Sequence, residues 1–401
     1  MNENVIKIIT LICFLAFSCG QKSDTDNIVE EYPFQIIPTD SITVNNILAT
    51  LFLFQNVNEE HIFFRDAGAS KIFIFERSGN LLNEWSKSGD VPGAFSMIAD
   101  NLVFTSKGDI VVSDNLNGIK EFSLDGTLLL DAKPFQYQSG ISADVKLFRK
   151  TQVIRKSGHE YLLHHLDLMD EVQTIGESFF KRRKNLLLTS LSTGESSQHL
   201  YFPTESKFFQ SGKAFPFEDF RPIFYYEEKE SKLYLIFQNE PVLYEFDWSE
   251  FEPKLINHYR LNLEGFHEHE GWDYNQIPYG KLNTENLDSP YSSKILSLEK
   301  TGDYFLINYK PGPSKSDVEK WKHAFSKDAP KNLKEEYLAK AEPRTVVFKD
   351  KEIISQGIHH LKMHYDSYRV IEDEIWWMKP LNKDKEDESF TIYKGNLKEI
   401  M

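Results

Sequence analysis

Residues 62–85 read IFFRDAGASKIFIFERSGNLLNEW, and residues 110–130 read IVVSDNLNGIKEFSLDGTLLL. The two stretches are copies of one unit. Each copy contains an apolar strand, a turn, a second strand that ends in aromatic and charged residues, a turn centred on glycine, and a third strand. A unit of several strands that repeats every ~40 to 50 residues is typical of one blade of a β-propeller.

The first strand of this unit recurs four more times, each time after a polar turn. The later copies lie at residues 161–163, 233–236, 304–307 and 375–378. Together the six copies predict an all-β chain that folds as a six-bladed β-propeller over residues 32–401. Residues 32–37 and 41–44 also resemble strands, and we expect one of them to pair with the last blade, since closing the ring removes exposed strand edges.

The spacing between copies grows from about 48 to about 71 residues, so the later blades carry insertions. Residues 310–343 separate the second and third strands of the fifth blade, and this insertion contains two stretches with helical periodicity, residues 317–325 and 333–341. A second insertion, residues 265–292, joins the fourth and fifth blades. Connections of these two kinds open on the same face of a propeller, so both insertions are expected at one mouth of the central channel.

Short motifs in the first two blades indicate a family. They are Phe75-Glu76 with Gly79, residues 89–95, residues 108–114, and Phe122 with Asp125-Gly126. This series resembles the six-bladed β-propeller lipoproteins of Bacteroidota, which are related to NHL-repeat propellers and many of which have no assigned function. The resemblance implies a six-bladed ring that belongs to the cell envelope.

An apolar run precedes the propeller. Residues 5–18 are too few to span a bilayer and indicate a signal peptide over residues 1–18. The end of this run, LAFSC, resembles a bacterial lipobox, which implies cleavage before Cys19 and a lipid anchor on its thiol. An ordinary secretory signal with an incidental cysteine is the alternative. The polar residues 19–31 are expected to form a flexible tether, and the anchor predicts an outer-membrane lipoprotein, either periplasmic or surface-exposed.

The composition limits the classes of partner and of chemistry. The chain has 46 basic and 61 acidic residues and a formal net charge of −15, which argues against nucleic acid and anionic lipid as partners. It has two cysteines, and Cys13 lies in the predicted signal peptide. The mature chain would keep only the lipidated Cys19, so neither a disulfide nor thiol catalysis is expected.

The sequence contains no strong catalytic motif, and its first candidate site is FHEHEGWDY at residues 266–274. His267 and His269 alternate, so they lie on one side of an extended segment, as two ligands of a divalent metal could. Trp272 and Tyr274 could stack on a sugar ring. The alternative, which we favour, is an acidic exposed loop whose aromatic side chains pack on the rim.

Three other groups of residues are weaker candidates. His164 and His359 each belong to a pair of adjacent histidines, which point to opposite faces of a strand and supply at most one ligand each. A structural role is favoured for both. Arg221 could line the channel and hold an anion, although a structural salt bridge is favoured. Residues 181–184, KRRK, could bind an acidic glycan or a lipid surface, and a solvated loop is favoured.

These observations favour a non-enzymatic binding or scaffold module that recognises a protein, peptide or glycan through its decorated rim. The alternative is a metal-dependent lyase or hydrolase at the channel mouth, by analogy with NHL-type lyases and lactonase-like propellers, whose metal ligands lie there. The sequence requires no cofactor.

Overall fold

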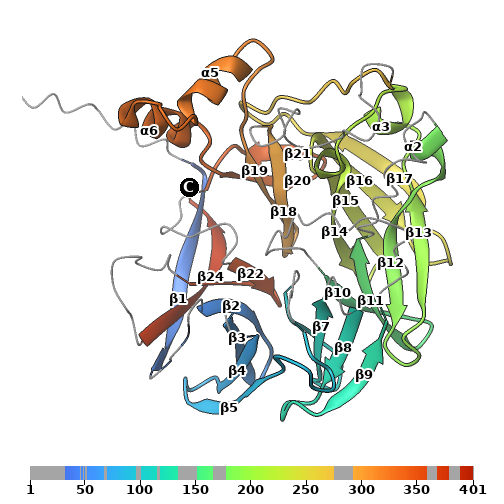
Figure 1. Cartoon of the computed structure of the whole chain (residues 1–401), viewed down its shortest axis with the longest axis vertical. Coiled ribbons are helices and arrows are strands. Elements are labelled where there is room, and N and C mark those ends of the chain that lie inside the picture. Colours follow the sequence, from blue (N-terminus) through green and yellow to red (C-terminus); the bar gives the residue numbers. More distant parts are fainter. Residues whose placement is uncertain are drawn as a thin grey trace, which may run out of the picture. The chain divides into compact units, whose positions relative to one another are not determined.

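The computed structural model describes residues 32–45, 47, 49, 52–66, 70–95, 101–114, 118–133, 151–165, 178–274, 292–358, 368–378 and 389–400. The strands of these residues form six four-stranded antiparallel sheets arranged in a ring, as Figure 1 shows. The chain is therefore a six-bladed β-propeller, and the predicted fold class is confirmed.

The first three blades follow one another along the chain, each with four consecutive strands. Blade 1 contains β2 (Phe52–Val57), β3 (His61–Asp66), β4 (Lys71–Glu76) and β5 (Leu81–Ser86). Blade 2 contains β6 (Val103–Phe104), β7 (Ile110–Asp114), β8 (Gly118–Phe122) and β9 (Leu128–Ala132). Blade 3 contains β10 (Gln152–Lys156), β11 (His159–His165), β12 (Lys184–Ser190) and β13 (Ser196–Tyr201).

Blades 4 and 5 keep the same order, and blade 6 is completed from the other end of the chain. Blade 4 contains β14 (Pro222–Glu227), β15 (Lys232–Phe237), β16 (Glu240–Asp247) and β17 (Lys254–Arg260). Blade 5 contains β18 (Lys294–Thr301), β19 (Tyr304–Lys310), β20 (Arg344–Lys349) and β21 (Glu352–Ser355). Blade 6 contains β22 (Tyr368–Ile371), β23 (Glu374–Met378), β24 (Ser389–Glu399) and the early strand β1 (Phe34–Asn45).

The ring closes where β1 pairs with β24. The pairing runs from Phe34 opposite Glu399 to Asn45 opposite Ser389, with a register shift after Pro38. Both early segments predicted as strands belong to β1, so the expected closure is confirmed and is longer than either segment alone. This pairing places the first strand beside the last one, so neither of them is left unpaired.

The core is divided into six clusters of buried side chains, and each lies between two adjacent blades. Neighbouring residues of a strand face opposite sides of its sheet, so one strand can contribute to two clusters. Trp376 packs with the side chains between blades 6 and 1, and Trp377 packs with those between blades 5 and 6. Central strands buried on both faces explain why β3 and β4 have continuous apolar runs instead of alternating ones.

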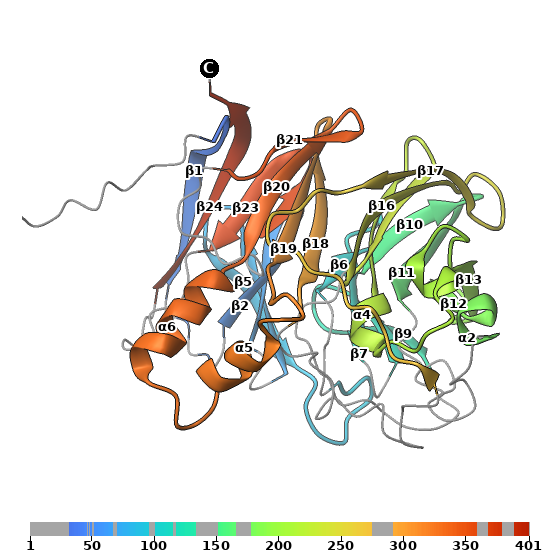
Figure 2. The same cartoon turned by 90° about the horizontal axis from the view of Figure 1, so that it is seen from above.

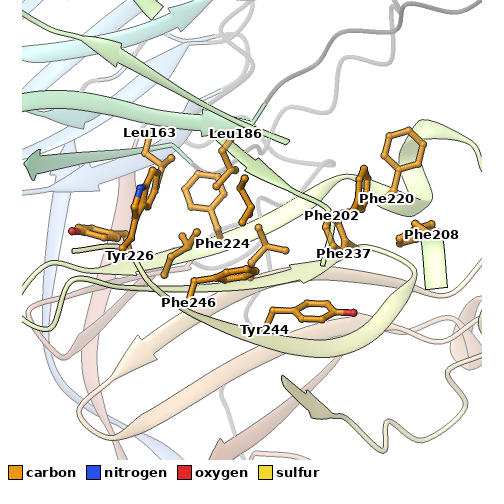
Figure 3. Close-up of a cluster of buried hydrophobic side chains, with 14 of the residues drawn as sticks. Leu163, Leu186, Phe202, Phe208, Phe220, Phe224, Tyr226, Phe237, Tyr244 and Phe246 are labelled. Atoms are coloured by element: carbon orange, nitrogen blue, oxygen red, sulfur yellow. The ribbon is translucent and has the colours of Figure 1, made fainter. Parts of the chain in front are cut away.

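The largest cluster lies between blades 3 and 4, and Figure 3 shows part of it. Leu163 and Leu186 come from blade 3, and Phe224 and Phe246 come from blade 4. At one end, rings from the connection between these blades complete the cluster, where Phe202 stacks on Phe237 with 4.9 Å between ring centroids. Burying one such side chain contributes about 1.5–3 kcal/mol, so the cluster fixes this connection on the ring.

Among the described residues, five short helices lie in the connections. They are α2 (Ser178–Arg182), α3 (Lys207–Gln210), α4 (Phe217–Phe220), α5 (Val318–Ala324) and α6 (Lys331–Lys340). The last two form the predicted helical insertion between β19 and β20 of the fifth blade, which is confirmed. They pack on each other through a separate small core that includes Trp321, Ala324, Tyr337 and Ala341.

Closure of the ring can be tested at the turn between β4 and β5. A Cβ atom on Gly79 would lie 2.5 Å from the carbonyl oxygen of Thr43 in β1, whereas one on Gly108 would meet nothing within 4 Å. Both glycines have left-handed backbones, with φ of +90° and +84°. Gly108→Ala is expected to cost ~1–2 kcal/mol for its backbone alone. Gly79→Ala should cost a further ~1–3 kcal/mol, because it presses on the closing strand.

Urea unfolding of the two variants beside the parent chain measures this difference. Equal losses of stability in Gly79→Ala and Gly108→Ala would show that the contact with β1 contributes nothing to closure.

Candidate functional site

The two insertions meet on one face of the ring. Lys315, which follows β19, makes an ion pair with Glu270 of the segment between blades 4 and 5, with 2.7 Å between Nζ and Oε2. Figure 2 shows α4, α5 and α6 on the same side of the sheets. The helical insertion and the described part of the second insertion, residues 265–274, therefore lie on one rim, as their connection types predicted.

The base of the candidate site is the connection that leads into blade 4. Here the backbone N–H of Asn239, in the turn between β15 and β16, donates to the carbonyl oxygen of Asp219 at 2.8 Å. The N–H of Gln238 donates likewise to the carbonyl oxygen of Arg221 at 3.0 Å. These bonds fix the end of α4 against a rigid hairpin of blade 4.

Residues 266–274 are attached to this base by backbone pairing. Ala214 and Trp272 form an antiparallel bridge with N···O distances of 2.9 and 3.0 Å. Gly271 is required beside the bridge, since its φ is +73° and a Cβ atom there would lie 2.7 Å from the ring of Phe215. The N–H of His269 donates to Asn239 Oδ1 at 2.6 Å, so this insertion has a defined position on the rim.

At the centre of the site His269 meets a buried carboxylate. Its Nδ1 lies 3.0 Å from Asp219 Oδ2, and the Asp219 side chain is only 1% exposed while that of His269 is 20% exposed. The ring of Trp272 lies edge-on to the imidazole with 4.0 Å between centroids. A carboxylate on Nδ1 holds the proton there and leaves Nε2 as an acceptor. The arrangement can therefore offer a hydrogen-bond acceptor beside an aromatic ring.

Lys207 contacts both parts of the site, the hairpin of blade 4 and the insertion at residues 266–274. Its Nζ lies 2.5 Å from the carbonyl oxygen of Asn239, 3.3 Å from that of His269 and 3.5 Å from Glu268 Oε2. Burial lowers the pKa of Lys207, and the charges of Glu268, Asp219 and Glu240 act against this shift. The ammonium group thus lies between the hairpin of blade 4 and the insertion and holds them together.

The structure brings some of the predicted site residues together and separates others. His269 and Trp272 are in contact, and Arg221 is two residues from Asp219. The Tyr274 hydroxyl donates to the carbonyl oxygen of Lys213 at 3.1 Å, and the backbone N–H of His267 donates to Ser293 Oγ at 2.8 Å.

The other predicted residues do not join this site. His164 lies in β11, where its Nε2 is 3.0 Å from Thr189 Oγ1 and burial lowers its pKa to about 4. His359 and the predicted lipidation site, Cys19, lie outside the described residues. Within the part of the chain that the structure describes, no three His, Cys, Asp or Glu side chains are grouped so that they could hold a metal ion.

The expectation of a solvated loop for the basic run was wrong in part, since Lys181 and Arg182 are exposed but the run is not a loop. Residues 181–184 instead span the end of α2 and the start of β12, and the Arg183 side chain is buried. Its guanidinium group lies 5.4 Å from the ring centre of Phe217, and the guanidinium group of Arg221 lies 5.0 Å from the same ring. Aromatic rings of the connection into blade 4 thus pack against these guanidinium groups, a contact that the sequence of the basic run did not indicate.

Sequence reasoning missed Lys207, Asp219 and Asn239. The first two lie in a stretch, residues 179–220, whose pattern placed no strand or helix. Five phenylalanines from residue 208 to residue 220 were the available signal, because such a density of large rings in a loop indicates that the loop is packed and not solvated.

Solved structures of Bacteroides proteins are similar to this fold. A member of the DUF4221 family from Bacteroides vulgatus superimposes with a TM-score of 0.60 at 10% identity, over 92% of this chain and 99% of that one. A Bacteroides fragilis protein inferred to be exported gives a TM-score of 0.52 at 10% identity, over 92% and 95%. At this identity the likeness shows the fold alone, and at that level it confirms the resemblance to the six-bladed propellers of Bacteroidota.

No protein-family model matches the chain, and no curated protein matches its sequence. None of the helices that the structure describes is both long enough and apolar enough to cross a membrane.

The role of Lys207 in holding the site together can be tested by Lys207→Ala. Loss of its charge-assisted hydrogen bonds is expected to cost about 2 kcal/mol of stability and to speed hydrogen exchange at residues 266–274. Urea unfolding and exchange mass spectrometry measure both effects. Lys254→Ala is the control, because it removes an ion pair whose two side chains are 65% and 69% exposed and should leave both quantities unchanged. Unchanged exchange at residues 266–274 in Lys207→Ala would contradict this role.

Proposed function

We propose that the protein is a cell-envelope lipoprotein whose propeller binds a protein, peptide or glycan through the rim that carries the two insertions. The observation that supports this function best is the contact between the insertions through Lys315 and Glu270. It joins the helical pair α5–α6 to residues 266–274, so the two most elaborated connections form one continuous surface on a rigid ring. Variable loops on a rigid scaffold are the usual location of binding sites.

The chemistry of this rim suits recognition of a partner. Trp272 offers an aromatic ring, His269 offers a nitrogen acceptor held by a buried carboxylate, and the charged pair Lys315–Glu270 is exposed at the edge. A polar rim around aromatic anchors is typical of protein and glycan recognition alike. Ligand binding at this surface needs no cofactor.

The envelope location is supported by two independent observations. Residues 1–18 have the pattern of a signal peptide that ends at a lipobox-like Cys19, and a protein of the same fold from Bacteroides fragilis is inferred to be exported. Lipidation of Cys19 would tether the propeller through residues 19–31 and leave the ring outside the bilayer.

The lipid anchor is tested in cells of a Bacteroides host grown with an alkyne-bearing fatty acid. The parent chain should incorporate the label and sediment with membranes, whereas Cys19→Ala should do neither, because the only cysteine of the mature chain is gone. Cys13→Ala is the matched control and should behave as the parent. A labelled, membrane-bound Cys19→Ala protein would exclude this anchor.

The binding face is tested by photo-crosslinking in the same cells. A benzophenone amino acid at position 315 should capture a defined protein, peptide or glycan, because this position lies at the junction of the insertions. The same probe at position 254, another exposed lysine position next to the turn between β16 and β17, reports on the opposite face. Capture only from position 254, or identical products from both positions, would rule out the decorated rim as the binding surface.

A further inference from the structure

A second group of polar side chains lies away from the decorated rim, at the outer side of blades 3 and 4. Ser197 and His199 belong to β13, the edge strand of blade 3, and Glu252 belongs to the turn between β16 and β17. Residues two apart on a strand share a face, so Ser197 and His199 both point toward this turn of blade 4.

The three side chains are arranged in series. Ser197 Oγ lies 2.8 Å from His199 Nε2, and His199 Nδ1 lies 3.6 Å from Glu252 Oε2. The hydroxyl and the carboxylate thus lie at opposite nitrogens of one imidazole, which is the order that a nucleophile, a general base and an orienting acid require. The contact of the acid is longer than a hydrogen bond, and such contacts are often looser before a substrate is bound.

The exposures of the base, His199, and of the nucleophile, Ser197, also fit these roles. The His199 side chain is 1% exposed, while Ser197 is exposed at the surface. The imidazole is covered by Phe251, with 5.1 Å between ring centroids, and by Trp248 at 5.7 Å. Because the base is buried and the nucleophile is accessible, the base can take the proton of the nucleophile directly, without water as an intermediary.

Burial of the imidazole favours its neutral form. Burial lowers the pKa of His199, the charge of Glu252 acts against this shift, and the charges of Lys184 and Lys156 add to it. Lys184 Nζ also lies 2.5 Å from Glu252 Oε1, which leaves the other oxygen of this carboxylate to face His199. A neutral imidazole with its proton on Nδ1 has Nε2 available to accept the hydroxyl proton of Ser197.

The backbone beside His199 is strained. Leu200 has a φ of 65°, and among the described residues it is the one non-glycine position inside a strand with a left-handed backbone, since the others lie in turns. Asn185 Nδ2 holds this conformation by donating to the carbonyl oxygen of Leu200 at 3.3 Å. A bulky residue in this region costs free energy, and such strain is concentrated at functional sites.

We propose that Ser197, His199 and Glu252 form a hydrolytic centre for carboxylic esters, in which Ser197 and His199 are catalytic and Glu252 is a positioning residue. The apolar part of the acyl or alcohol group would rest on Phe251, which is 74% exposed although it covers the base. Because β13 is an edge strand, backbone N–H groups that alternate along it point to solvent and can donate to the oxyanion.

The reaction proceeds in two balanced halves. Ser197 Oγ forms a bond to the ester carbonyl carbon while its proton passes to His199 Nε2. The bond from this carbon to the alcohol oxygen then breaks, and His199 returns the proton to the departing alkoxide. In the second half water attacks the acyl-serine with His199 as base, and the acid leaves as the Ser197 Oγ recovers its proton. This centre is independent of the rim and does not rest on the proposed binding function.

The centre is tested on the full chain with a fluorophosphonate probe, which reacts with activated serines and releases fluoride. Peptide mass spectrometry should find the probe on Ser197, at a rate about 100-fold above that on Ser192, an exposed serine in the turn before β13. Ser197→Ala should lose this labelling and the hydrolysis of p-nitrophenyl acetate. Labelling of Ser197 no faster than that of Ser192 would overturn the proposal.

A substitution at Glu252 tests the centre without changing the hydrophobic core, because the Glu252 side chain is 38% exposed. Glu252→Gln should slow labelling of Ser197 by about 10-fold or more at an unchanged melting temperature, and Glu252→Asp should restore part of the rate. Equal labelling rates in all three forms would show that this carboxylate does not act on His199 and would overturn its assigned role.

Discussion

Pairing of β1 with β24 is the constraint on which the rest of the structure depends. It joins residues more than 340 positions apart, from Asn45 with Ser389 outward to Phe34 with Glu399. Each of the six core clusters lies between two blades, so the first and last blades bury both of their faces only when the ring is complete. Closure therefore completes the last interface, and it makes the ring a rigid support for its connections.

Rigidity of the ring explains why polar residues can fix the decorated rim. Glu240 begins β16, and its carboxylate accepts from the hydroxyl of Ser206 at 2.9 Å and from the N–H of Lys207 at 2.6 Å. Burial raises the pKa of Glu240, and these donors together with the charge of Lys207 act against the shift. Buried polar groups stabilise one conformation only where all partners are in place, so the network needs the fixed hairpin of blade 4 beneath it.

The sequence predicted the ring well and the site only in part. Repeated units carry their own periodicity, so the second strand of every blade, such as β11 at Tyr161 and β23 at Trp376, was placed correctly from local pattern. Contacts between connections have no such period. Asp219 and His269 are 50 residues apart, and the turn at Asn239, which binds the backbone of both, helps to bring them together. The contact of His199 with Glu252 likewise depends on two neighbouring blades and leaves no local pattern.

The two histidine sites differ in which of their groups is exposed. At the rim the carboxylate of Asp219 is almost fully buried and its histidine is partly exposed, so the imidazole is the group on the surface. At the outer strand this order is reversed, since Glu252 is exposed, His199 is buried, and the exposed hydroxyl is that of Ser197. An outward imidazole suits recognition, whereas a buried one with a hydroxyl on Nε2 suits proton transfer. Because β16 connects the rim to the turn of Glu252, blade 4 supports both sites while keeping them on opposite faces.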